Sequence, residues 1–129
     1  MTTQALQDHI LFQTGYLVNG IWKTLDTTFD VFNPATGEVI AKVAKAGKAQ
    51  TEEAIAAATK AFPAWRAKTA KERSAILYRW YELIIENKSW LGQLMTTEQG
   101  KPLKEAEGEV DYAASFIQWF AEQGKRANG

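Results

Sequence analysis

The longest helix that the sequence predicts is too apolar for the outside of a small domain. It begins at Pro102 and runs to about residue 126. At ~100° per residue, its apolar side chains form two stripes, about a quarter to a third of a turn apart. Together the stripes cover more than about half of the helix circumference, which is typical of a helix held between two layers. The first stripe contains Leu103, Ala106, Val110, Ala113, Ile117 and Phe120, and the second contains Tyr112, Phe116 and Trp119.

Three further helices precede this one. We expect N-caps at Thr51, Thr69 and Ser89, and Glu72 stands three residues after Thr69, the spacing of a capping box. Pro63 is expected to end the first of these helices. Gly100 suits a helix C-terminus with positive φ, and Pro102 suits the first turn of the next helix. The faces expected to be buried contain Ile55, Ala58, Ala61 and Phe62 in the first helix, Ile76, Leu77, Trp80, Leu83 and Ile84 in the second, and Leu91, Leu94 and Met95 in the third.

Two β-hairpins are predicted before the helices. Asn19-Gly20 lies between two short apolar runs, which is the strongest local signal for a type I′ hairpin turn. The second hairpin joins strands at 29–32 and 39–43 through a loop containing Pro34 and Gly37. The sequence therefore predicts an α+β fold of two hairpins followed by four helices. A polar leader occupies residues 1–10, and the segment 11–129 holds hairpins within 11–46 and helices within 51–126.

Composition excludes several classes of function. Lysines plus arginines and aspartates plus glutamates number 15 each, so no basic patch favours nucleic acid. No apolar run approaches the ~20 residues needed to span a bilayer, and the N-terminus lacks the pattern of a secretory signal. With no cysteine, the chain has neither disulfides nor a thiol nucleophile. These features favour a soluble cytoplasmic protein, and the single histidine, His9, is interpreted as a solvated residue of the leader.

Candidate motifs for chemistry are few. Gly100-Lys101 lacks the glycine and the Ser/Thr of a phosphate-binding loop, and no GxGxxG follows a strand. Glu105, Glu107 and Glu109 could be catalytic carboxylates, but a solvated cluster facing the positive end of the helix dipole is the better interpretation. The five tryptophans lack an accompanying basic groove, so core packing is favoured over stacking on bases or sugars.

Three blocks of the sequence resemble the N-terminal region of aldehyde dehydrogenases. They are FDVFNPATGEVIAKV, AFPAWRAKTAKERSAIL and LMTTEQGKPLKEAEGEVDYAASFIQWFAEQGKR. The third is most similar to the succinate-semialdehyde dehydrogenase branch, and the resemblance extends over nearly the whole chain after Leu11. It implies NAD(P)+-dependent oxidation of an aldehyde to an acid, through a catalytic cysteine and a glutamate-activated water that this sequence does not contain.

The resemblance also implies roles for particular positions. The chain is expected to be an N-terminal fragment of an oligomeric enzyme, inactive and without bound cofactor by itself, with no catalytic residue of its own. Tyr112 and Phe116 are expected on the side of the last helix nearest the substrate entrance. Glu98, with the backbone carbonyls of Val31 and Phe32, corresponds to a monovalent cation site of some family members, many of which have Asp in place of Glu98.

Two hypotheses for function remain open from the sequence. The first is the N-terminal part of a dehydrogenase for succinate semialdehyde or a similar aldehyde. The second is a stand-alone binding or assembly module that associates through the apolar face of its last helix. In either case the expected partner of helix 102–126 is a second copy of the chain or the rest of an enzyme.

Overall fold

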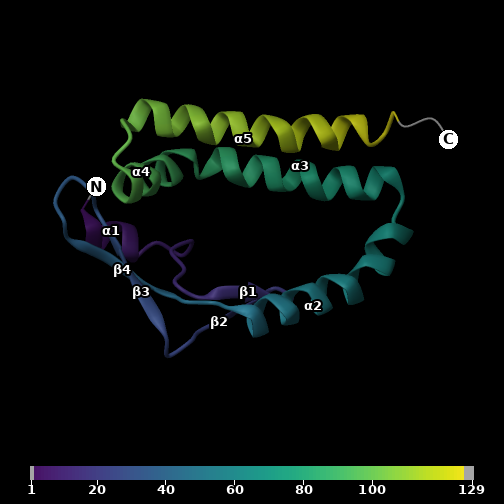
Figure 1. The fold of residues 1–129 in the computed structure, drawn as a ribbon. Helices are drawn as coiled ribbons and strands as arrows, with labels where there is room; N and C mark the ends of the chain where they lie inside the picture. The colour runs from purple at the N-terminus through teal and green to yellow at the C-terminus, as the bar shows by residue number, and fades with distance from the viewer. Residues whose placement is uncertain (1, 127–129) are drawn as a thin grey trace. The chain divides into compact units, whose positions relative to one another are not determined.

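The computed structural model describes residues 2–126, which form five helices and two antiparallel sheets of two strands each (Figure 1). They divide into two compact units, one containing residues 2–63 with 97–100 and the other 64–96 with 101–126. In chain order the elements are α1 (Thr3–Gln7), β1 (Tyr16–Val18), β2 (Ile21–Lys23), β3 (Thr28–Phe32), β4 (Val39–Ala44), α2 (Lys48–Ala67), α3 (Ala70–Glu86), α4 (Lys88–Gln99) and α5 (Leu103–Gln123).

Both predicted hairpins are present in the first unit. Asn19 and Gly20 have φ of 52° and 75°, the left-handed values that a type I′ turn requires, and Val18 pairs with Ile21 across the turn. β3 pairs with β4, and a bulge interrupts the register between Val31 and Phe32. Leu6, Val18 and Ile40 form the small buried core of this unit.

The outer edge of β4 is partly covered by the N-terminal segment. The side-chain Nε2 of Gln7 donates to the Ile40 carbonyl at 2.7 Å, and the Ala44 amide donates to the Thr14 carbonyl at 2.8 Å. The leader therefore contributes the short helix α1 and helps to hold the second hairpin in place.

The predicted ends of α2 were wrong. The helix begins at Lys48, and Thr51 lies within it, donating through its hydroxyl to the Gly47 carbonyl. Pro63 does not end the helix, which continues to Ala67. A proline so near the C-terminal end removes one backbone donor, and the helix tolerates that loss. The large residues of its predicted apolar face, Ile55 and Phe62, are exposed. The hairpin β1–β2 lies instead beside a line of alanines, Ala54, Ala57, Ala58 and Ala61, of which only the last two belong to the predicted face.

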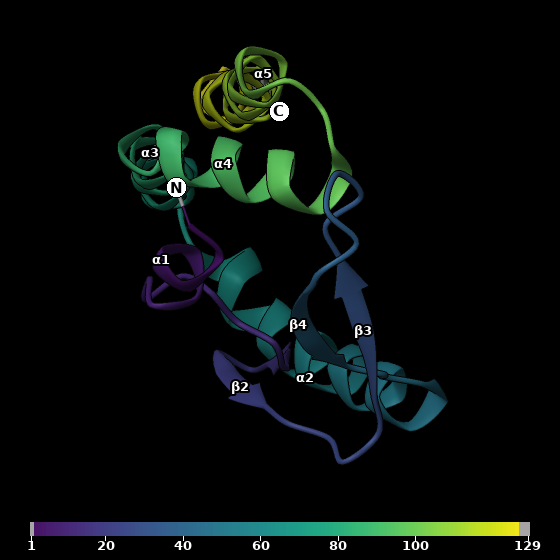
Figure 2. The ribbon, with the colours of Figure 1, turned by 90° about the vertical axis from the view of Figure 1, so that its left-hand side faces the viewer.

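The second unit is built on the pair α3 and α5. Thr69 and Glu72 form the predicted capping box at the start of α3. The two helices run antiparallel and side by side, as seen from the front in Figure 1 and along their axes in Figure 2. The residues of α5 that are buried are small, which allows the backbones to approach closely; they are Ala106, Val110, Ala114 and Ala121.

α4 starts earlier than predicted, and the corner after it is as predicted. Asn87 is the C-cap of α3 and α4 begins at Lys88, so Ser89 is not an N-cap. Trp90 and Gly92 are the buried residues of α4, and Leu91, Leu94 and Met95 are half-buried. Gly100 has φ of 80°, the left-handed C-terminal conformation expected of it. Pro102 is the N-cap of α5 rather than its first helical residue.

Much of the apolar surface that was expected to be buried is exposed. On α3, Ile76, Trp80 and Leu83 are exposed, because α5 covers a different side of the helix. On α5, Leu103, Ala113 and Phe120 of the first stripe are exposed. The expectation that the tryptophans pack in a core was wrong for Trp22, Trp80 and Trp119, which are exposed in this chain.

Candidate functional site

Gly100, which follows the last residue of α4, is packed against the loop that joins β3 to β4 within the first unit. A Cβ at Gly100 would lie 2.9 Å from the Pro34 Cγ, so no larger residue fits without a shift. The loop is held by Asn33, whose backbone N–H donates to the Glu38 backbone carbonyl and whose side-chain Oδ1 accepts from the Ala35 amide. Glycine is required here for both its positive φ and its close approach.

Glu98 is the carboxylate of this corner that was predicted to bind a cation. The residue lies on the surface, yet crowding around its carboxylate removes enough water to raise its pKa. It makes no ion pair within residues 2–126. Val31 and Phe32 belong to the same compact unit and flank the bulge in β3, where the backbone leaves regular pairing. The described residues contain no group of three His, Cys, Asp or Glu side chains placed to hold a metal.

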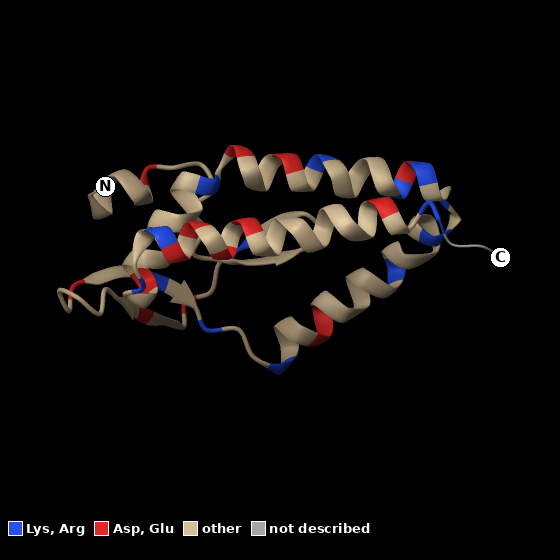
Figure 3. Ribbon diagram, turned by 90° about the horizontal axis from the view of Figure 1, so that it is seen from above, with Lys and Arg blue, Asp and Glu red and all other residues tan. Residues whose placement is uncertain are grey.

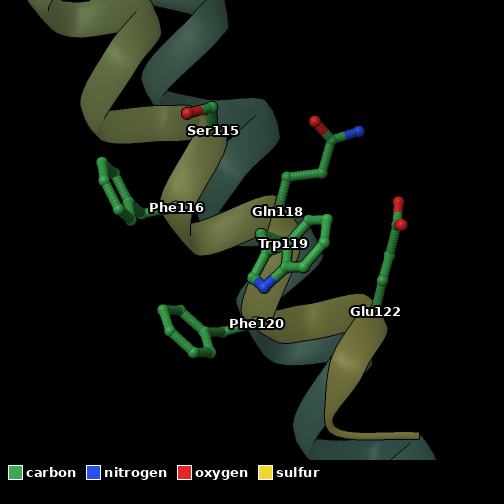
Figure 4. A pocket seen from close by; sticks show the side chains of 6 residues that line it. All are labelled: Ser115, Phe116, Gln118, Trp119, Phe120 and Glu122. Atoms are coloured by element: carbon green, nitrogen blue, oxygen red, sulfur yellow. The ribbon is translucent and has the colours of Figure 1, made fainter. Parts of the chain in front are cut away.

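The side of α5 that faces away from its buried alanines is aromatic. Tyr112 and Phe116 pack edge to face, with ring centroids 4.8 Å apart and an interplanar angle of 84°. Tyr112 is 66% exposed, Phe116 47% and Trp119 58%. Figure 4 shows Phe116 and Phe120 pointing to one side of α5 and Gln118 and Glu122 pointing to the other, with Trp119 between the two pairs. This surface, defined by Tyr112, Phe116, Trp119 and Phe120, is called the α5 aromatic face below.

Polar groups surround the α5 aromatic face without interrupting it. An open hollow along the helix is lined by Ser115, Gln118 and Glu122 together with the aromatic side chains. No charged residue occurs from Tyr112 to Ala121. In Figure 3 the acidic residues of α5 gather in its N-terminal part, and a long uncharged stretch precedes the charges at its C-terminal end. An apolar centre with a polar rim is the composition of a contact surface.

The acidic cluster at the start of α5 has structural contacts. Glu109 is paired with Lys101, and Asp111 accepts from Lys88 at 2.5 Å, so these two carboxylates tie α5 to the preceding corner and to α4. Glu107 packs against Gly92 of α4, where an added Cβ would lie 2.7 Å from its Cγ. These contacts favour a structural role for the cluster.

The strands of the described residues differ from those of a dinucleotide-binding fold. They form two antiparallel pairs, whereas the turn that cradles a pyrophosphate joins a strand of a parallel sheet to a helix. The Gly-Lys-Pro corner joins two helices and has the wrong residues for a phosphate loop. As for the membrane, none of the helices within residues 2–126 combines the length and apolar content needed to cross a bilayer.

Comparison with known proteins decides the family. The protein-family sequence model described as "Aldehyde dehydrogenase family" matches residues 22–129 of the chain. The chain belongs to the aldehyde dehydrogenase family. It is 61% identical over 126 residues to glutarate-semialdehyde dehydrogenase of Pseudomonas putida, and 52% identical over 126 residues to the NADP(+) succinate-semialdehyde dehydrogenase of Escherichia coli K12. Each of these matches covers 96% of this chain and 26% of the relative.

Solved structures give the same result for the fold. Succinate-semialdehyde dehydrogenase from Burkholderia pseudomallei superposes with a TM-score of 0.86 at 55% identity, over 92% of this chain and 25% of that one. The two hairpins and the helices thus match the N-terminal part of the aldehyde dehydrogenase fold, which confirms the predicted fold class. The chain spans about a quarter of the length of the curated relatives that it matches.

Sequence reasoning missed two features of this region. Phe120 was assigned to the buried stripe but extends the α5 aromatic face, and its 61% exposure could not be foreseen from apolar spacing alone. Gly92, the close-contact residue of α4, was not singled out. Its signal was a glycine in the middle of a helical pattern, which usually marks a packing requirement.

Proposed function

We propose that this chain is the N-terminal part of an NAD(P)+-dependent dehydrogenase for the semialdehyde of a short dicarboxylic acid. The observation that carries the proposal is the 61% identity to a glutarate-semialdehyde dehydrogenase across almost the whole chain. Two Pseudomonas relatives are named for glutarate semialdehyde and the E. coli relative for succinate semialdehyde. The substrate class proposed is therefore a four- or five-carbon aldehyde with a carboxylate at its far end.

The chain needs the rest of such an enzyme for catalysis. It contains no cysteine to attack the aldehyde, and its described residues lack a dinucleotide fold. The purified 129-residue chain should therefore give no NADH or NADPH with succinate or glutarate semialdehyde. Sustained turnover by the chain alone would contradict this part of the proposal.

A chimera tests the function directly. In it, this chain replaces the corresponding quarter of the P. putida glutarate-semialdehyde dehydrogenase, and the parent enzyme is the matched control. The chimera should oxidise glutarate semialdehyde with the parent's cofactor. A chimera that is folded and binds the cofactor, yet does not oxidise the aldehyde, would refute the proposal.

Within that enzyme, we place Tyr112 and Phe116 near the substrate entrance. Their exposure leaves the two rings free to contact a molecule that passes over α5. In the chimera, Tyr112→Ala and Phe116→Ala should raise KM for the semialdehyde more than they lower kcat. Ile76→Ala, on α3 and with the same 47% exposure as Phe116, is the control and should leave KM unchanged. Equal effects of all three variants would contradict the assignment.

We also propose that Glu98 and the carbonyls of Val31 and Phe32 bind a monovalent cation. The support is a crowded carboxylate without an ion pair among the described residues, in the same unit as an irregular strand segment. Potassium or sodium chloride should raise the melting temperature of the chain more than tetramethylammonium chloride does. The difference should vanish in Glu98→Gln, and its persistence there would remove Glu98 from the site.

A second candidate function follows from the α5 aromatic face. Four large exposed side chains on one helix favour an assembly module that associates through this face. The enzyme proposal is preferred because it accounts for the similarity along the whole chain. The assembly proposal accounts only for α5.

A further inference from the structure

The turn between β1 and β2 contains a dipeptide whose chemistry the function above does not use. In an asparagine followed by glycine, the side-chain amide is open to attack by the next backbone nitrogen, because glycine has no side chain to shield that nitrogen. Asn19 and Gly20 are both exposed, and apart from their chain neighbours no atom lies within 4 Å of the position of a Cβ at Gly20. The Gly20 nitrogen can therefore approach the Asn19 side chain without displacing a neighbouring group.

The backbone of Asn19 is one rotation away from the geometry that this attack requires. Closing a five-membered ring between the Asn19 side chain and the Gly20 nitrogen makes Cβ eclipse that nitrogen. In an L-residue this corresponds to a ψ of roughly −120°, which with a φ of about +60° is the first central residue of a type II′ turn. Asn19 already has φ of 52°, so a flip of the peptide between Asn19 and Gly20 is enough to convert the type I′ turn into type II′. Gly20 tolerates the change in the sign of its own φ that accompanies the flip.

We propose that Asn19 is a site of deamidation through a succinimide, formed when the turn passes from type I′ to type II′. Hydroxide removes the Gly20 amide proton, the nitrogen bonds to the Cγ of Asn19, and the side-chain nitrogen takes up a proton from water and leaves as ammonia. Water then opens the ring. Attack at Cγ gives aspartate, and attack at the backbone carbonyl gives isoaspartate, in which the main chain runs through Cβ. The net reaction consumes one water and releases one ammonia, and it does not rest on the proposed function.

Contacts of the folded hairpin oppose the flip. Val18 is buried and pairs with Ile21 across the turn, and Lys23 forms an ion pair with Glu53 of α2. Asn19, Lys23 and Glu53 line one hollow between the hairpin and α2, within the first unit. Deamidation should therefore be slower in the folded chain than in the chain unfolded by urea. Two-stranded hairpins are marginally stable and open locally at little cost, so the difference should be about tenfold.

Peptide mapping of the aged chain tests the site. The 129-residue chain is incubated at pH 8 and digested with trypsin, which places its asparagines in separate peptides, 1–23, 24–42, 80–88 and 127–129. Among the first three, the mass change from amide to acid should accumulate fastest in peptide 1–23, and isoaspartyl methyltransferase should label that peptide. Peptide 127–129 contains a second Asn-Gly, which lies outside the described residues and is measured separately.

Two other asparagines among the described residues serve as controls. Asn33 precedes a proline, whose nitrogen has no proton to lose. Asn87 is the C-cap of α3, its Nδ2 donates to the Leu83 carbonyl at 2.8 Å, and a lysine follows it. Asn19 should react roughly tenfold or more faster than either control. An Asn19 that reacts no faster than Asn87, or that gives aspartate without isoaspartate, would overturn the proposal.

The ion pair between the hairpin and α2 tests the role of the turn. Lys23→Gln and Glu53→Gln both remove the pair but change the local charge in opposite directions, and each should speed deamidation of the folded chain by roughly two- to fivefold. Lys42→Gln is the control, because it removes an exposed pair with Asp30 in the other hairpin and should leave the rate unchanged. Acceleration by Glu53→Gln alone, or equal rates in the folded and the urea-unfolded chain, would show that the turn does not control the reaction and would overturn the proposal.

Discussion

Gly92 offers a test of how closely α4 and α5 are packed. Substitution of a helical glycine by alanine normally stabilises a helix by about 1 kcal/mol. At Gly92 the new Cβ would lie 2.7 Å from the Cγ of Glu107 and 3.3 Å from its backbone nitrogen. At Gly108, which is also helical, nothing lies within 4 Å of the new Cβ. The pair of variants therefore separates the packing clash from the gain in helix propensity.

The magnitude follows from the contacts. Gly108→Ala should raise the free energy of unfolding by about 1 kcal/mol. Gly92→Ala gains the same propensity but incurs the ~1–3 kcal/mol that overpacking costs, because a backbone atom of Glu107 cannot rotate away. The difference between the two variants should thus be about 2 kcal/mol, with Gly92→Ala the less stable.

Urea unfolding followed by circular dichroism measures this difference. With a slope of about 1–3 kcal/mol/M, the two midpoints should differ by roughly 1 M. Adding Glu107→Ala to Gly92→Ala removes the nearest atom, the Cγ, and should recover part of the loss as a coupling energy. If Gly92→Ala is as stable as Gly108→Ala, the close approach of α4 to α5 is not a constraint and the reasoning fails.

Three further substitutions test local features. Thr69→Ala should cost about 1 kcal/mol of unfolding free energy at pH 7. The hydrogen bonds from Thr69 lower the pKa of Glu72, so the stability that they contribute is present above the ordinary pKa of 4.5 and is lost as pH falls through the lower folded value. Urea titration should therefore show a smaller effect of Thr69→Ala at pH 3 than at pH 7. In tetramethylammonium chloride, without a cation that Glu98 could bind, Glu98→Gln should raise the melting temperature at pH 7 and not at pH 3, since burial raises the pKa of this carboxyl and stability falls as pH rises above 4.5; an equal effect at both pH values would contradict this cause. Pro63→Ala restores a backbone donor for the Thr59 carbonyl and should stabilise α2 by up to ~3 kcal/mol. Amide hydrogen exchange at residues 64–67 should therefore become slower. Unchanged exchange would show that Pro63 imposes no cost on α2.

The features that sequence reasoning predicted best depend on a few adjacent residues. Asn19-Gly20, the capping box of Thr69 with Glu72, and the left-handed Gly100 are each set by local backbone preference. Such preferences act whatever lies elsewhere in the molecule. The end of α2 was mispredicted because a proline disfavours the middle of a helix and is tolerated close to its end, which only the position of the last turn decides.

Burial was predicted less well, and for a physical reason. Apolar spacing shows which side of a helix avoids water, but it does not show whether the same chain supplies the cover. Ile76, Trp80 and Leu83 share one side of α3, as predicted, yet they are exposed because α5 contacts another side. On α5 the small residues, and not the large ones, are buried, since close helix approach selects alanine at the contact.

The apolar excess of α5 can therefore be divided between two surfaces with different requirements. The line through Ala106 and Ala114 is satisfied by α3 of the same chain. The line through Tyr112, Phe116 and Trp119 is exposed among the described residues and leaves roughly 350 Å² of aromatic surface uncovered, within the ~300–600 Å² of the largest patch on a typical monomer, which is often functional. In relatives about four times as long, the remaining three quarters of the chain is available to cover that line. In the proposed dehydrogenase this line lies near the substrate entrance, so Phe116→Ser in the chimera should raise KM for the semialdehyde more than it lowers kcat, whereas Ile76→Ser on α3 should change neither.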